Sequence, residues 1–184
     1  MQKTALLVMD MQSAVLAMIA DSTAVKSNVI KAITHARKKQ IPVLYVVVGF
    51  RAGGPEINPN NKSFATFKKS MANTDPAAWM KIDDAFAPLP GEVIITKRRV
   101  SAFAGSDLEI VLRSQGIQHM ILTGLATSGV VLSTLREAAD KDYRLTVLSD
   151  CCADRDEEVH RVLVEKVFPR QADVLTVDEW TAKP

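Results

Sequence analysis

The sequence has few of the residues that build disulfide frameworks or metal sites. Its 184 residues include two cysteines and three histidines. Cys151 and Cys152 are adjacent, and two cysteines are too few for a disulfide framework. The histidines, His35, His119 and His160, are scattered without the spacing of a metal-ligand motif. We therefore expect no metal and no cofactor.

An excess of charge of one sign and long apolar runs are also lacking. The 23 Lys and Arg residues exceed the 21 Asp and Glu residues by only two. No basic run or basic-aromatic stripe occurs, so we expect no nucleic-acid partner. No apolar stretch approaches the ~20 residues that span a bilayer, so we expect no membrane partner. The apolar run near the N-terminus, TALLVM, is too short for a signal peptide, which makes a cytoplasmic location the expectation.

Apolar runs alternate with amphipathic segments along the whole chain. Continuous apolar strands separated by helices indicate a parallel sheet covered on both faces. We therefore predict an α/β fold, a three-layer α/β/α sandwich with a six-stranded parallel doubly wound sheet, in a single domain of residues 1–184. The predicted strands are 4–9, 43–48, 93–96, 120–123, 145–148 and 172–176, and the main helices are 22–39, 106–116, 127–140 and 154–168.

Local signals support several of these helices. Val25, Val29, Ile30 and Ile33 recur at helical spacing and predict one buried face. Two pairs, Ser106 with Glu109 and Asp154 with Glu157, have the spacing of a helix-capping pattern. Gly116 is typical of the position that ends a helix.

Residues 49–92 interrupt the alternation of apolar strands and amphipathic helices. The segment is too long for a simple connection between strands. Its first part is polar, and its second part predicts a helix capped by Asp75 and Pro76, with Trp79, Ile82 and Phe86 as apolar anchors. We interpret it as a lid or substrate-binding segment, with a packing or subunit-contact insertion as an equal alternative. Exposed apolar residues and this insertion also predict a homodimer or a higher homo-oligomer.

An acid and a cation end two of the predicted strands. Asp10 follows the first strand and Lys97 follows the third, and the fourth strand runs through Gly124 into a helix. Carboxyl ends of parallel strands share one edge of a sheet, so these groups are expected to meet over a helix N-terminus. Such a site can position a proton donor and bind an oxyanion. The alternative is that the lone acid only caps a turn.

Three short motifs at these strand ends resemble those of a known family. The motifs are VMDMQ at 8–12, ITK at 95–97 leading to SAF at 101–103, and TGLAT at 123–127 leading to Thr134. Together they are similar to the motifs of the isochorismatase-like hydrolases, which include nicotinamidases, carbamoylsarcosine amidohydrolases and isochorismatases. The resemblance covers nearly the whole chain, in order and at fitting spacing.

The family's thiol members use an Asp–Lys–Cys triad. The resemblance implies that Asp10 and Lys97 occupy the first two positions and that Val130 occupies the position of the nucleophilic cysteine. A valine cannot attack a carbonyl, so the thiol route is not expected here. The acid-and-histidine metal site of nicotinamidases is also missing, since residues 50–61 contain no histidine. Cys151 and Cys152 are interpreted as buried structural residues.

Isochorismatases of the family also lack the cysteine and cleave a vinyl ether by protonation and water addition. The resemblance therefore implies that Asp10 is a general acid and that Lys97 orients it or holds a substrate carboxylate. The tyrosine-alanine-histidine run of isochorismatases is replaced by Leu125, Ala126 and Thr127. The reaction is inferred by elimination. Two alternatives stay open, a pseudoenzyme that keeps its pocket for ligand binding or assembly, and an amidohydrolase with a displaced nucleophile.

The substrate is expected to be a small, anionic molecule. Arg51, Arg98 and Arg99 are candidate anion contacts, with solvated surface charge as the alternative. The resemblance also implies a cis peptide between Leu125 and Ala126. The residues expected to bind substrate are Gln12, Phe50, Arg51, Phe103, Leu125, Ala126, Thr127 and Gly129. Trp79 is a further candidate for the pocket wall, or an ordinary core residue.

Overall fold

The computed structural model describes residues 3–70 and 75–183 and has one six-stranded parallel sheet. The strands are β1 (Lys3–Met9), β2 (Val43–Val48), β3 (Val93–Lys97), β4 (Ile117–Leu125), β5 (Arg144–Ala153) and β6 (Asp173–Leu175). They lie in the order β3-β2-β1-β4-β5-β6. The order reverses between β1 and β4, the point at which sheets of this kind bind ligands. The predicted fold class is confirmed.

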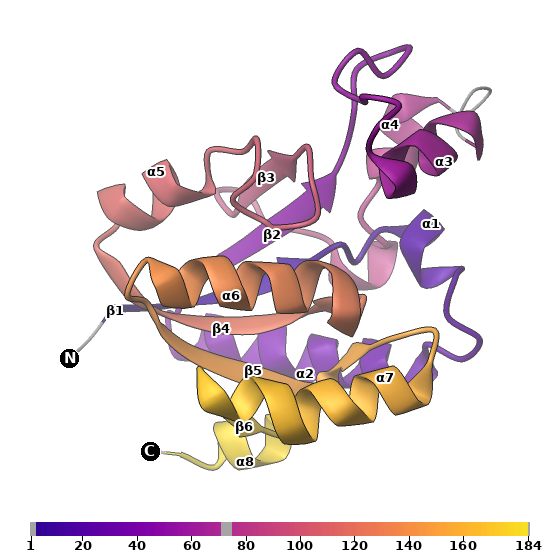
Figure 1. Cartoon of the computed structure of the whole chain (residues 1–184). Helices are drawn as coiled ribbons and strands as arrows, with labels where there is room; N and C mark the ends of the chain where they lie inside the picture. The colour runs from indigo at the N-terminus through magenta and orange to yellow at the C-terminus, as the bar shows by residue number, and fades with distance from the viewer. Residues whose placement is uncertain (1–2, 71–74, 184) are drawn as a thin grey trace.

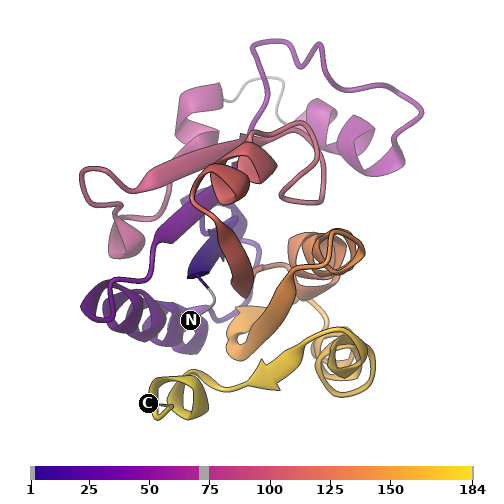
Figure 2. The same cartoon turned by 90° about the vertical axis from the view of Figure 1, so that its left-hand side faces the viewer.

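Helices cover both faces of the sheet and make the middle one of three layers (Figures 1 and 2). One face packs against α2 (Thr23–Lys38) and α8 (Val177–Thr181). The other packs against α5 (Leu108–Ser114), α6 (Leu132–Asp140) and α7 (Glu157–Val162), which continues through η3 (Leu163–Val167) and η4 (Phe168–Arg170). Leu6 and Val8 of β1 face the first group, whereas Leu7 and Met9 face the second, as strand alternation requires.

The 49–92 segment leaves the carboxyl end of β2 and extends beyond the sheet (Figure 1). It contains α3 (Lys62–Ser70), α4 (Pro76–Met80) and the 3-10 turn η1 (Asp84–Phe86), and it packs beside the short α1 (Ser13–Leu16). Asp75 caps α4 by accepting the N–H of Ala77, as predicted. The predicted helix through Phe86 is wrong, because α4 ends at Met80 and Phe86 instead packs in the core beside α2.

An aromatic cluster holds this segment together. Phe50, Phe64, Phe67 and Trp79 lie with ring centroids 4.6–6.5 Å apart. Contacts of this kind add about 0.5–1.5 kcal/mol each beyond the burial of apolar area. The segment thus has an apolar centre of its own next to the carboxyl edge of the sheet.

Several local predictions are wrong in detail. Helix α5 begins at Leu108, and Glu109 pairs with Lys141 in place of closing a capping box with Ser106. Asp156, not Asp154, caps α7 by accepting two backbone N–H groups. Ile30 is 40% exposed because it falls beside the buried stripe of α2. Among the described residues, no helix is both long enough and apolar enough to cross a membrane.

Candidate functional site

Asp10 and Lys97 meet at the carboxyl edge of the sheet. Asp10 directly follows β1, and Lys97 is the last residue of β3, two strands away. Lys97 Nζ lies 2.9 Å from Asp10 Oδ2. The pair is almost fully enclosed, with 6% of Asp10 and 2% of Lys97 exposed. The contact expected from the two strand ends is therefore present, and it is buried.

Lys97 uses every proton of its ammonium group within the protein. Besides the Asp10 carboxylate, it donates to the carbonyl oxygens of Arg99 at 3.1 Å and Val100 at 2.9 Å. An ammonium group has three donors, so none is left for a substrate carboxylate. Lys97 is therefore placed to hold and orient Asp10, which is one of the two roles expected for it.

Asp10 is held in an environment that raises its proton affinity. Burial raises the pKa of Asp10 to about 6, although the charge of Lys97 opposes the rise. Its Oδ1 atom is buried and has no hydrogen-bond partner within the described residues. The residue also has a left-handed backbone with φ of 55°, which costs a non-glycine residue about 1–2 kcal/mol. A strained, enclosed carboxyl with a free oxygen is typical of a functional group.

Near its carboxyl end, β4 lies very close to the backbone of β1. Gly124 pairs with Met9 in the register of the two strands. A side chain at Gly124 would place its Cβ 2.6 Å from the carbonyl oxygen of Met9, so only glycine fits there. The peptide bond between Leu125 and Ala126 is cis, as the family resemblance implies.

The segment after β4 is not the regular helix predicted from residue 127. Residues Thr127–Val131 form a wide π-type turn, η2, in which Gly129 has φ of −94° and ψ of −105°. Val130 is 2% exposed and belongs to the core shared with α6. The Thr127 hydroxyl lies 2.8 Å from His160 Nδ1, and the backbone N–H of Ser128 donates to Asp154 at 2.7 Å.

Gln12 has no exposed surface, and its side-chain amide is saturated by hydrogen bonds to backbone groups. Its Nε2 donates to the carbonyl oxygens of Val48 at 3.2 Å and Trp79 at 2.7 Å, and its Oε1 accepts the N–H of Val48 at 2.8 Å. Trp79 also donates its indole N–H to the Val48 carbonyl. The amide thus ties the strand end to the 49–92 segment and leaves no donor for a ligand.

Phe50 and Arg51 line a separate cavity of about 410 Å³ inside the 49–92 segment. Phe67 and Trp79 form other parts of its wall. Asp10, Lys97 and Val130 do not line this cavity. Trp79 links the two places, because the Val48 carbonyl that accepts its indole N–H belongs to the residue paired with Lys97 in the sheet.

The three candidate arginines converge on Glu56. Arg51 forms an ion pair with the Glu56 carboxylate at 2.6 Å, and Arg98 approaches it at 3.9 Å. Arg99 donates to the Glu56 backbone carbonyl at 2.8 Å. Three cations against one acid leave a positive excess where the loop after β3 meets the 49–92 segment.

Phe103 belongs to the loop after β3, in which the carbonyl oxygen of the next residue, Ala104, accepts the N–H of Arg98 at 3.0 Å. Its ring stacks on Tyr143 with centroids 6.2 Å apart, and the ammonium of Lys141 lies 5.5 Å from its centroid. Tyr143 precedes β5 and therefore sits at the amino edge of the sheet. The loop after β3 also packs along α6, where the Ala102 N–H donates to Thr134. The expected substrate contact of Phe103 stays a prediction.

Both cysteines are part of β5, which extends to Ala153 and not to Leu148 as predicted. Cys151 is fully buried and Cys152 is 4% exposed. Burial raises the pKa of both thiols, that of Cys152 to about 12. Neither thiol is therefore a thiolate at neutral pH, which is the form that attacks a carbonyl.

Sequence reasoning missed Asp154 and His160. Asp154 immediately follows β5, so the strand-end criterion that selected Asp10 would have selected it with the correct strand boundary. His160 contacts Thr127 from 33 residues away, and no spacing in the sequence signals that contact. In the described part of the chain, no group of three or more His, Cys, Asp and Glu side chains is arranged to hold a metal ion.

Known proteins are similar to this chain over its whole length. The family model described as "Isochorismatase domain" matches residues 4–179. The uncharacterized isochorismatase family protein YwoC of Bacillus subtilis is 31% identical over 97% of this chain and 93% of its own length. An isochorismatase family protein from Burkholderia thailandensis superposes with a TM-score of 0.85 at 26% identity, covering 98% of this chain and 94% of its own.

Two relatives have names that state an activity. The N-carbamoylsarcosine amidase of an Arthrobacter species is 36% identical over 65% of this chain, which spans less than half, 46%, of that protein. The ureidoacrylate amidohydrolase RutB of Pseudomonas syringae is 32% identical over 80% of this chain and 69% of its own length.

Proposed function

The chain belongs to the isochorismatase family, and we propose that it is a hydrolase of a small anionic molecule that works by acid–base chemistry without a thiol. In this proposal Asp10 protonates the carbon of a vinyl ether, water adds to the resulting oxocarbenium ion, and the Asp10 carboxylate takes a proton from that water. The hemiketal so formed then breaks its C–O bond to release an alcohol and a carbonyl product. Val130 stands at the nucleophile position of the thiol relatives and serves as a pocket wall.

The buried Asp10–Lys97 pair carries this proposal. A carboxyl with a pKa of about 6 is partly protonated near neutral pH, so it can both give and take a proton there. Lys97 donates its three ammonium protons to Asp10 and two backbone carbonyl oxygens, so it fixes the position of the Asp10 carboxyl group. The free Oδ1 of Asp10 is the atom that would carry the transferred proton.

The arginine cluster around Glu56 supports an anionic substrate. Its excess positive charge lies where the loop after Lys97 meets the segment that contains the 410 Å³ cavity. Phe50 and Arg51 line that cavity, and in this proposal they bind the part of the substrate that extends away from Asp10. Gln12 becomes a positioning residue, because its amide is saturated by the backbone. The start of η2, including Gly129 and the Leu125–Ala126 peptide, completes the proposed binding edge.

A second candidate is amide hydrolysis with a displaced nucleophile. One contact favours it, the hydroxyl of Thr127 at 2.8 Å from His160, which has the geometry of a nucleophile and its base. Two relatives are named as an amidase and an amidohydrolase. Against it, Thr127 has no exposed surface.

Four proteins separate these mechanisms, namely the wild type, Asp10→Asn, Thr127→Val and the double variant Cys151→Ser with Cys152→Ser. Each is assayed by NMR against a panel of anionic vinyl ethers and amides. We expect Asp10→Asn to lose about 10²–10⁴-fold in rate, because asparagine keeps the shape but transfers no proton. The wild-type rate should fall as the pH rises through about 6 and Asp10 loses its proton.

The other two variants are the matched controls. The double cysteine variant should keep its rate, since both thiols are buried and protonated. If Thr127→Val is inactive and Asp10→Asn is active, the displaced nucleophile replaces our proposal. If no panel member turns over while ligands still bind, the protein is a pseudoenzyme.

A further inference from the structure

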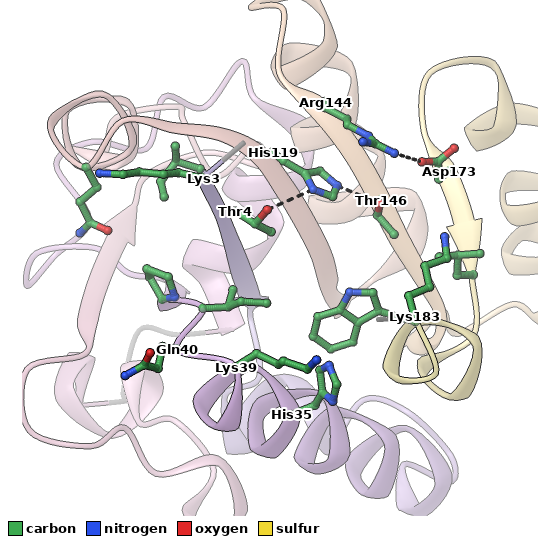
Figure 3. A pocket seen from close by; sticks show the side chains of 16 residues that line it. Lys3, Thr4, His35, Lys39, Gln40, His119, Arg144, Thr146, Asp173 and Lys183 are labelled. Atoms are coloured by element: carbon green, nitrogen blue, oxygen red, sulfur yellow. Dashed lines mark hydrogen bonds and ion pairs between the residues drawn. The ribbon is translucent and has the colours of Figure 1, made fainter. Parts of the chain in front are cut away.

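A second cavity lies at the opposite, amino edge of the sheet and has a volume of about 760 Å³. It is bounded by the first residues of β1, β4, β5 and β6 and by the C-terminal ends of α2 and α8. Figure 3 shows these strand beginnings facing the end of α2 across the cavity. Pockets for small ligands are ordinarily about 300–1,000 Å³, so the size suits a compact metabolite.

Positive charge is concentrated in the walls of this cavity. Lys3, Lys39, Lys183 and Arg144 line it together with a single acid, Asp173. Asp173 is already paired with Arg144 at 3.2 Å. Four cations minus one acid give +3, which exceeds the net charge of +2 for the whole chain. Within residues 3–70 and 75–183, the three lysine ammonium groups make no ion pair or hydrogen bond.

The ends of two helices account for only part of this charge. Lys39 follows α2 and Lys183 lies just beyond α8, and cations are favourable at such positions. Each helix C-terminus carries about −0.5 of an elementary charge, so two ends offset about −1 at most. Glu179, whose pKa is lowered in part by the charge of Lys183, offsets a further share, and a positive excess of about +1 remains.

The strands supply an uncharged, hydrogen-bonded floor. His119 lies between Thr4 and Thr146, with its ring nitrogens 3.3 Å and 2.9 Å from their hydroxyl groups (Figure 3). Burial and the nearby charge of Arg144 lower the pKa of His119 to about 4, so its ring is neutral at pH 7. The positive charge of the cavity therefore belongs to the lysines and Arg144.

An aromatic wall accompanies the charges. Trp180 lines the cavity and meets the ring of His35 edge-on, with centroids 4.8 Å apart. Ile41, Pro42 and Leu175 add apolar surface. Aromatic and apolar walls with a few convergent polar groups are the usual composition of a site for a planar ligand.

We propose that this amino-edge cavity binds a small phosphate ester that carries a planar ring, of the nucleoside monophosphate class. The phosphate lies against Lys39 and Lys183, and the ring packs on Trp180. The site is separate from the proposed active edge, because the seven-residue β1 runs between them.

Adenosine monophosphate, adenosine and inorganic phosphate are the probes. Titrations by calorimetry and by tryptophan fluorescence use the full-length protein at low and high salt. We expect saturable binding of adenosine monophosphate, weaker binding of either fragment, and a loss of affinity as salt screens the lysines. The double variant Lys39→Ala with Lys183→Ala should bind at least about tenfold more weakly.

Matched variants locate the site. Lys62→Ala removes a lysine of α3 outside this cavity and should bind like the wild type. Trp180→Phe should remove the fluorescence response, although Trp79 remains. Asp10→Asn should leave binding unchanged, so failure of the proposed activity does not affect this test. Absence of saturable binding at about 10 mM probe, or equal binding by the double-lysine variant, would overturn the proposal.

Discussion

The lysines at the two edges of the sheet differ in burial and in hydrogen bonding. At the carboxyl edge, Lys97 is 2% exposed and gives each of its donors to a fixed acceptor. At the amino edge, about 20 Å away along β1, Lys39 and Lys183 line a cavity, and neither ammonium group forms a hydrogen bond or ion pair within the described residues. A paired, buried charge is part of the fold and can fix an acid, whereas unpaired charges are available to an external anion.

The first prediction removes one lysine from each edge. Lys97→Ala leaves the Asp10 carboxylate buried without its cation and should lower the free energy of unfolding by about 3–5 kcal/mol at pH 8. The loss should be smaller at pH 5, because Asp10 can then take a proton. Lys39→Ala should change stability by about 0.5 kcal/mol or less. Urea denaturation measures both, and equal losses would erase the distinction between the edges.

The second prediction concerns two groups whose pKa values move in opposite directions. Folding raises the pKa of Asp10 from 3.8 to about 6. Its protonation therefore stabilises the folded protein fully below pH 3.8, and this stabilisation is lost as the pH rises through 6. The loss amounts to about 3 kcal/mol. Folding lowers the pKa of His119 from 6.5 to about 4. The neutral ring therefore contributes to the stability of the fold above pH 6.5, and this contribution is lost as the pH falls through 4.

Because His119 is partly exposed, we expect its contribution to be about 1–2 kcal/mol. The two slopes oppose each other between pH 4 and 6.5 in the wild type. Asp10→Asn should leave stability rising with pH over that window, and His119→Gln should leave it falling. Unfolding free energies at several pH values measure both slopes. A wild-type curve that neither variant alters would show that these groups titrate normally.

The third prediction has the smallest effect on stability. Val130→Cys replaces one small buried side chain by another and should change the free energy of unfolding by about 1 kcal/mol or less. If Val130 stands at the family's nucleophile position, the new thiol should react with iodoacetamide in the native protein. Mass spectrometry should find one adduct in the variant and none in the wild type, because the nearby charge of Lys97 favours a thiolate at position 130, whereas the pKa of both native thiols is raised. An unmodified variant would contradict the placement of Val130 beside Asp10 and Lys97.

The sequence predicted the sheet well because its strands are buried on both faces. Such strands are nearly continuous apolar runs, and each of the six appears at its predicted place. The predicted end of the fifth strand was wrong, since β5 continues through polar Ser149 and Asp150 to Ala153. The meeting of Asp10 with Lys97 also followed from the sequence, because parallel strands bring their carboxyl ends to one edge.

The amino acids alone thus determined the layers, the chain order and which charged groups end the strands. Only the tertiary structure decided where the loops go. It packed the Phe103 ring against Tyr143, saturated the Gln12 amide with backbone hydrogen bonds and joined His160 to Thr127 across 33 residues. It also gathered the amino-edge lysines around one cavity from positions 3, 39 and 183. The periodicity of strands and helices depends on neighbouring residues and can be recognised in the sequence, whereas loop direction and side-chain pairing depend on contacts between segments far apart in the chain.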